Sequence, residues 1–233
     1  TLLFPVWGRL RTGERWRSGL LVSRDGGLTW GEYRTIAYDA EARLLGEYRC
    51  PEVSGFDRYG RFDPAAPFHP DFRPHSAVDG FNETFLVRLP DGAILAILRQ
   101  QGVRGGKQLE LFRSVSADGG RSWSEPRPIG IQGMSPWLHQ SPGGRLQLFY
   151  RRHAPHDGEE AGVAAGWSED GGDTWQGEVA LVDPLGHRYT SEYQAGYPTA
   201  VNLTDRHILV VFYSYSPALP GRYLAATLLE ECA

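Results

Sequence analysis

Long apolar runs and blocks of like charge are absent from the sequence. No segment approaches the roughly 20 consecutive apolar residues that a membrane-spanning helix needs, and residues 1–7 lack the basic region and cleavage site of a signal peptide. The 24 Lys and Arg against 28 Asp and Glu give a formal net charge of −4, with no basic run for a polyanion. We therefore expect a soluble chain with no membrane span and no nucleic acid partner.

Cysteine and metal-ligand patterns are also scarce. The two cysteines, Cys50 and Cys232, lie far apart in the chain and are either two free thiols or one disulfide, so they leave the compartment open. The spacing of five histidines is not that of a zinc site. They are His69, His75, His139, His153 and His156. We predict no metal site and no cofactor.

Glycine, proline and aromatic residues, by contrast, are abundant. The chain has 29 Gly and 16 Pro, and 12% of its residues are aromatic. Since Gly and Pro supply the backbone angles of tight turns, this composition is typical of many short strands. A chain of 233 residues is short for two ordinary domains. We predict a single all-β, repeat-built domain over residues 1–233.

One eight-residue motif with the pattern S-x-D-G-G-x-[ST]-W occurs three times. Its copies are residues 23–30, 116–123 and 168–175. The Asp can accept hydrogen bonds from nearby backbone amides, the two glycines permit positive φ in a tight turn, and the Trp can cover the hairpin. Apolar, β-rich segments flank each copy, so we expect each box, as the motif is called below, to connect two strands.

A second recurrent element consists of a strand, a polar turn and another strand. It spans residues 83–99, 136–151 and 197–213. Together with the strands around each box, it gives four short antiparallel strands per unit, the composition of a propeller blade. We count about four blades or part-blades. Residues 1–10 are predicted to be the second strand of a blade, so an N-terminal portion of the propeller is expected upstream of this sequence.

Residues 38–80 separate the first blade from the second. This segment is rich in proline, which removes a backbone donor and breaks strands. Its prolines include Pro51, Pro64, Pro67, Pro70 and Pro74. We interpret the segment as a long inserted loop over one face of the propeller.

With these boxes and blades, the sequence resembles the sialidase (neuraminidase) superfamily, whose members carry S-x-D-x-G-x-[ST]-W boxes. The resemblance covers most of the chain and implies a sialidase-like β-propeller of the six-bladed type. In that superfamily the boxes lie at the periphery of the blades, away from the active site. The chemistry must therefore be sought in other residues.

The resemblance implies a Glu at the start of an inner strand, then a D-G turn, then an Arg at the end of the next strand. Glu83, Asp91-Gly92 and Arg99 follow this order and spacing. It also implies a Tyr at the head of a later inner strand, where Tyr197 stands. The residue after it is Pro198, where the family more often has Ser.

A further arginine of the family's substrate-binding triad is expected between these two units. Arg151, or its neighbour Arg152, ends the intervening hairpin and is the candidate. An exposed ion pair is an alternative role for either residue. Structural roles are also alternatives for the other three candidates. Glu83 could be a solvated charge, Arg99 a partner of a structural carboxylate, and Tyr197 a packed aromatic ring.

The chemistry that the resemblance implies is exo-acting, retaining hydrolysis of a sialoside. Sialic acid has a carboxylate on its anomeric carbon, which would repel a carboxylate nucleophile, whereas a neutral phenol avoids that repulsion. Tyr197 is then the nucleophile and Glu83 the base that takes its proton. Arg99 and Arg151 would bind the substrate carboxylate through paired hydrogen bonds.

The family also needs an Asp from an early blade as general acid and a first arginine near its N-terminus, and both are expected upstream of this sequence. Acidic residues of the inserted loop are alternatives for the acid. They are Asp57, Asp63, Asp71 and Asp79. Aromatic side chains are either core material or a platform on which a sugar stacks. They are Trp7, Trp16, Trp137, Phe56, Tyr59, Phe62 and Phe68.

Two other functions remain open on this scaffold. One is a different glycan-active enzyme, either a polysaccharide lyase or a glycosidase of another sugar. The other is a glycan-binding module without catalysis. The sequence leaves the sugar, the linkage and the oligomeric state open.

Overall fold

The structure is a computed structural model. It describes residues 1–9, 15–41, 43–44, 80–101, 103–104, 107–108, 110–152, 162–181, 195–215 and 221–231. Every regular element in these ranges is a β-strand, which confirms the predicted all-β class. None of the described residues belongs to a helix of the length and apolarity needed to cross a membrane.

The strands form four antiparallel sheets and one short hairpin. The first sheet has the order β1 (Leu2–Gly8), β2 (Arg17–Ser23), β3 (Gly31–Ala37), and the second β4 (Gly80–Arg88), β5 (Ile94–Gln101), β8 (Glu110–Ser116), β9 (Arg127–Gln132). The third has the order β10 (Met134–Gln140), β11 (Leu146–Arg152), β12 (Gly162–Ser168), β13 (Gln176–Leu181), and the fourth β14 (Gly196–Asn202), β15 (His207–Tyr215), β16 (Arg222–Glu230). The hairpin pairs β6 (Val103–Arg104) with β7 (Lys107–Gln108).

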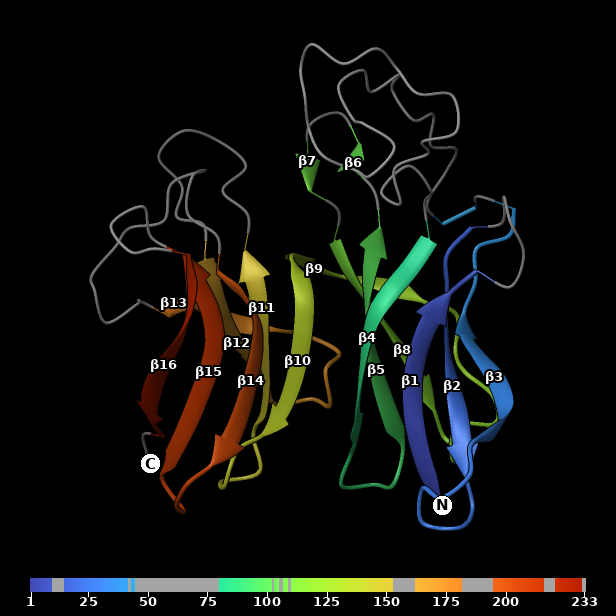
Figure 1. Ribbon diagram of the computed structural model, residues 1–233, viewed down its shortest axis with the longest axis horizontal. Coiled ribbons are helices and arrows are strands. Elements are labelled where there is room, and N and C mark those ends of the chain that lie inside the picture. Colours follow the sequence, from blue (N-terminus) through green and yellow to red (C-terminus); the bar gives the residue numbers. More distant parts are fainter. Residues whose placement is uncertain are drawn as a thin grey trace.

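The four sheets stand side by side in chain order, like neighbouring blades of a propeller (Figure 1). Strand β4 contacts β1 on one side and β10 on the other, and β10 in turn contacts β14. This arrangement confirms the prediction of about four blades or part-blades. Most of the segment predicted to be a long inserted loop, residues 45–79, lies outside the described residues, as do both cysteines.

Each box connects the two strands predicted to flank it, and all three boxes form the same turn. In the third box, the Ser168 hydroxyl donates to Asp170 Oδ1 (2.8 Å) and accepts a hydrogen bond from the Gly172 amide (2.8 Å). The Thr174 amide and hydroxyl both donate to the Asp170 carboxylate, at 2.9 and 2.6 Å. The first two boxes repeat these bonds. The Asp side chain thus replaces backbone partners that a tight turn leaves unpaired.

The second glycine of the box is required both by backbone angle and by space. Gly172 has φ 85°, a left-handed conformation that glycine adopts at little cost. A Cβ on Gly172 would lie 2.7 Å from the Leu95 side chain of the neighbouring sheet. The box of the third sheet therefore touches the second sheet closely, and the turn also helps to hold two blades together.

The apolar core lies between the sheets, as three clusters. One joins β2 to the second sheet through Leu20, Val22, Phe81 and Leu98. The next joins the second sheet to the third and includes Ile97 and Leu148, and the last joins the third to the fourth and includes Phe149 and Val210. Each strand that faces a neighbouring sheet contributes alternate residues, as expected from the two-residue period of strands.

Three sheets share an irregularity at the start of their first strand. The pairing register shifts after Asn82 in β4, after Met134 in β10 and after Gly196 in β14. Such a bulge inserts an extra residue and redirects its side chain. The redirected residues are Glu83, Ser135 and Tyr197, two of which the sequence predicts as site residues.

Candidate active site

The three bulge residues have the same unusual backbone conformation. Their φ angles are 38° for Glu83, 50° for Ser135 and 48° for Tyr197. Non-glycine residues rarely adopt positive φ, and where they do, the conformation is often part of a functional site. The bulges bring these three side chains, from three different sheets, into one hydrogen-bonded group.

The carboxylate of Glu83 is the centre of this group. Its Oε1 accepts a hydrogen bond from the Tyr197 hydroxyl (2.8 Å) and lies 2.7 Å from Arg99 Nη1. Its Oε2 accepts hydrogen bonds from the Ser135 amide (2.9 Å) and the Ser135 hydroxyl (3.2 Å). A carboxylate has about four acceptor positions, so these four donors satisfy it.

Tyr197 combines an exposed ring with an engaged hydroxyl. The residue as a whole is 61% exposed, whereas the side chain of Glu83 is only 10% exposed. Burial of the hydroxyl raises the pKa of Tyr197 above its ordinary value, and the hydrogen bond to Glu83 and the charge of Glu83 raise it further. Arg99 and Ser135 act in the opposite direction and lower this pKa. The resting pair is thus a neutral phenol donating to a carboxylate.

The strand next to each bulged strand also carries a set of equivalent positions, opposite the residue before the bulge. Arg99 pairs with Asn82, Arg151 with Met134 and Tyr213 with Gly196, which in each case is the residue just before the bulge. Arg99, Arg151 and Tyr213 therefore lie at the same height as the bulge residues.

Arg151 crosses from the third sheet to the fourth. Its Nη1 donates to the Tyr213 hydroxyl (3.3 Å), and a Cβ on Gly196 would lie 3.0 Å from Arg151 Cδ. Within the described ranges, no carboxylate forms an ion pair with Arg151, whereas Arg152 pairs with Glu178 (3.0 Å). Of the two arginines that the sequence offered, Arg151 reaches the Tyr197 sheet and Arg152 is engaged elsewhere.

By strand register, one aromatic residue of the first sheet is equivalent to Arg99 and Arg151. Leu2, Ile94 and Leu146 pair with the first serine of their boxes. Counting along from these pairs, Trp7 has the same place in β1 as Arg99 in β5 and Arg151 in β11. Trp7 is 45% exposed.

Other predicted candidates lie outside the group or outside the described residues. Trp137 packs against Phe85 with ring centroids 4.2 Å apart, as core material. The proposed alternatives for the general acid, Asp57, Asp63, Asp71 and Asp79, fall outside the described residues. In the part of the chain that the structure describes, no cluster of three His, Cys, Asp or Glu side chains could hold a metal.

Ser135 and Tyr213 are the residues that the sequence analysis missed. Neither belongs to a box, but each stands at the strand position of a predicted residue. Ser135 has the position of Glu83 and Tyr197, and Tyr213 has that of Arg99. Aligning the strand-turn-strand elements on their turns would have identified both.

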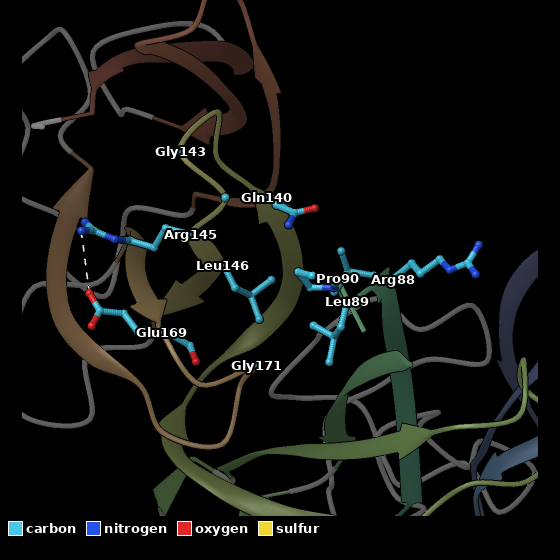
Figure 2. Close-up of a pocket in the computed structure, with 12 residues that line it drawn as sticks. Arg88, Leu89, Pro90, Gln140, Gly143, Arg145, Leu146, Glu169 and Gly171 are labelled. Atoms are coloured by element: carbon cyan, nitrogen blue, oxygen red, sulfur yellow. Dashed lines mark ion pairs between the residues drawn. The ribbon is translucent and has the colours of Figure 1, made fainter. Parts of the chain in front are cut away.

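A pocket at the opposite ends of the strands is separate from this group. It lies between the β4–β5 turn, the β10–β11 turn and the third box, and an ion pair between Arg145 and Glu169 spans 3.8 Å beside it (Figure 2). None of the predicted site residues lines it.

Comparisons with known proteins agree with the architecture. The chain matches the family described as "BNR repeat-like domain" over residues 1–208. A search of curated proteins finds no match. Among solved structures, a Dyadobacter fermentans protein of unknown function has a TM-score of 0.67 and 23% identity, covering 98% of this chain and 50% of that protein.

Two further solved structures are glycoside hydrolases. A Hadza microbial sialidase has a TM-score of 0.53 and 15% identity, covering 98% of this chain and 43% of the sialidase. A GH93 alpha-L-arabinofuranosidase of Fusarium graminearum, solved with arabinobiose, has a TM-score of 0.50 and 17% identity, covering 65% of this chain and 45% of the enzyme. The chain thus spans half or less of the length of each of these proteins, and at these identities the likeness concerns the fold.

Proposed function

The chain belongs to the BNR repeat-like domain family, and from this premise we propose that it is part of a glycan-active enzyme, an exo-acting, retaining glycosidase of the sialidase type. The observation that carries the proposal is the hydrogen bond of 2.8 Å from the Tyr197 hydroxyl to Glu83. A phenol is a weak nucleophile at neutral pH unless a base takes its proton. The Glu83 side chain is the acceptor at hydrogen-bond distance from that proton.

The reaction consists of two displacements at the anomeric carbon. In the first, Tyr197 Oη attacks this carbon while its proton passes to Glu83 Oε1, and the bond from the carbon to the leaving oxygen breaks. A general acid protonates the leaving oxygen. In the second, water attacks the same carbon and gives a proton to the deprotonated general acid, while the bond to Tyr197 breaks and Glu83 returns its proton to Tyr197 Oη. Two displacements at one carbon retain the configuration.

The choice of an acidic sugar is supported by two guanidinium groups beside the pair. Arg151 donates to the Tyr213 hydroxyl and forms no ion pair with a carboxylate in the described ranges, so its charge is available to a substrate carboxylate. Arg99 uses Nη1 for Glu83, and its Nε is buried without a hydrogen-bond partner among the described residues. Planar guanidinium groups bind carboxylates through paired, charge-assisted hydrogen bonds.

The test is hydrolysis of a fluorogenic α-sialoside by the natural full-length protein and by Tyr197→Phe. Removing the nucleophile is expected to reduce turnover to the level of the blank. Tyr33→Phe is the matched control, since Tyr33 lies on the outer strand β3, away from the group. Equal turnover by Tyr197→Phe and the unchanged protein would contradict the proposal.

A second candidate, another glycan-active chemistry on the same scaffold, is favoured by the pairing of Arg99 with Glu83. Of the two predicted substrate-binding arginines, that ion pair leaves Arg151 without a carboxylate partner among the described residues, which suits a uronate as well as a sialoside. Ultraviolet absorbance of an unsaturated uronate product, released from an acidic polysaccharide, would identify a lyase. Release of reducing sugar without that absorbance would identify a glycosidase of another sugar.

A further inference from the structure

Ser135 supplies two of the four donor groups around the Glu83 carboxylate, although it belongs to a different sheet. Both its amide and its hydroxyl donate to Glu83 Oε2, at 2.9 and 3.2 Å. The residue is 7% exposed and has φ 50° at the bulge of β10. Ser135 is thus buried, has a costly backbone conformation, and directs both of its donors at one carboxylate oxygen. This geometry indicates that its role is to bind that oxygen.

The two carboxylate oxygens have separate sets of donors. Oε2 accepts from Ser135, whereas Oε1 accepts from the Tyr197 hydroxyl and lies beside Arg99. A carboxylate free to rotate could exchange its oxygens, but two bonds to one oxygen from the bulge of β10 fix the carboxylate plane. Oε1 therefore stays directed at the Tyr197 proton.

We infer that Ser135 is a positioning residue. It binds Oε2 of Glu83, so that the other oxygen, Oε1, is oriented to take the proton of Tyr197. The inference rests on the proposed function for its catalytic meaning, but its geometry does not depend on the identity of the sugar. Ser135 acts through Glu83 and is not assigned a contact with the substrate.

Ser135 also affects the pKa of Tyr197. The Ser135 side chain lowers this pKa, against the effect of burial and of Glu83. Among the described residues, the other charged or titratable groups of this cluster are Glu83 from β4, Arg99 from β5, Tyr213 from β15, whose ring centroid lies 6.1 Å from that of Tyr197, and Arg151 from β11, which contacts Tyr213. Removing the Ser135 hydroxyl should therefore make the Tyr197 proton harder to remove.

Two variants distinguish the role of the Ser135 hydroxyl from the role of its backbone conformation. Ser135→Ala removes the hydroxyl and keeps the amide donor. Ser135→Gly also removes the hydroxyl but relieves the positive φ, so it should unfold no more easily than Ser135→Ala. If Ser135 served only to build the bulge, the glycine variant would keep full activity. If the hydroxyl positions Glu83, both variants lose activity together.

We expect kcat on the α-sialoside to fall roughly 10- to 100-fold in both variants, as for the loss of one hydrogen bond to a charged group, with KM changing little. Ser141→Ala is the matched control, because the Ser141 hydroxyl donates to the carboxylate of Glu231 (2.5 Å) just beyond the other end of β10. This control should lower stability and leave kcat unchanged.

A readout without substrate keeps the inference separate from the proposed function. Incorporation of 3-fluorotyrosine and fluorine NMR, with the Tyr197 signal assigned from Tyr197→Phe, gives the titration of that phenol. Ser135→Ala should titrate at higher pH than the unchanged protein, and Ser141→Ala should not. An unchanged titration and kcat in Ser135→Ala would overturn the role of Ser135, whereas inactivity of the unchanged protein with a shifted titration would overturn only the sialidase assignment.

Discussion

At the scale of single residues, the feature that distinguishes this chain is the repeated left-handed conformation of Glu83, Ser135 and Tyr197. Positive φ at a non-glycine residue costs about 1–3 kcal/mol, so three instances need compensation from the surrounding structure. The hydrogen bonds among the three side chains provide part of it. The backbone is therefore strained where the proposed chemistry takes place.

Gly196, one residue before Tyr197, is expected to control the approach of Arg151. In Gly196→Ala, the new Cβ would lie 3.0 Å from Arg151 Cδ and 3.2 Å from Tyr213 Cε1, so Arg151 must move. We predict that KM for an acidic substrate rises roughly tenfold, equivalent to the loss of one charge-assisted hydrogen bond, with a smaller effect on kcat. Steady-state kinetics measure this split.

Gly8→Ala is the control for that substitution, because a Cβ on Gly8 meets no atom within 4 Å. It should leave both kinetic constants unchanged. A Gly196→Ala variant with the KM of the unchanged protein would mean that Arg151 does not bind the substrate.

At the scale of elements, the boxes give each hairpin an acid-sensitive turn. Hydrogen bonds from the threonine of the box lower the pKa of Asp25 and of Asp170 to about 2, and those from Ser122 lower the pKa of Asp118 as well. In the unfolded chain an Asp titrates near its ordinary value of about 3.9. The contribution of each box to stability is thus complete above about pH 4 and is lost as the pH falls towards 2.

We predict that the free energy of unfolding falls between pH 4 and pH 2, and that Asp170→Asn reduces this fall, since one of the linked carboxylates is gone. Urea unfolding at the two pH values measures it. Asp205→Asn is the control, because Asp205 lies in the β14–β15 turn outside any box. Identical pH dependence in the two variants would show that the box carboxylate is not the linked group.

At the scale of the whole molecule, the site depends on packing between sheets, because its bulge residues come from β4, β10 and β14. The relative positions of these strands are set by the three apolar clusters between the sheets. The assignment of residues 1–233 to one propeller domain with an inserted loop stays a prediction. So does the general acid, which the family resemblance assigns to an earlier blade.

Phe149 tests the packing between the third and fourth sheets. It is fully buried, and Phe149→Ala is expected to lower the free energy of unfolding by about 3–5 kcal/mol, from lost burial and the cavity left behind. Leu228→Ala, at a leucine that is 56% exposed on β16, should change it by less than about 0.5 kcal/mol. Urea unfolding of the natural full-length protein compares them, and similar losses would contradict the assigned core.

Much of the fold was predictable because its signals are local. The boxes encode their own hydrogen bonds within eight residues, and the turns at Asp91-Gly92 and in the boxes identified the paired strands. Glu83, Arg99 and Tyr197 were predictable as candidates because the family resemblance fixes their places relative to those turns. Ser135 has no motif of its own, and only the alignment of the strand-turn-strand elements on their turns reveals that it is equivalent to Glu83 and Tyr197.

What the sequence determined by itself is therefore the repeated hairpin, the all-β class and the chain positions of the candidate residues. Only the tertiary structure decided that Arg151 and not Arg152 approaches Tyr213, which oxygen of Glu83 receives which donor, and that Ser135 takes part. The physical reason is that neighbouring residues in a strand point to opposite faces, and a bulge of one residue redirects the side chain. Side-chain direction at the strand ends thus depends on the pairing between strands, to which residues distant in the chain contribute.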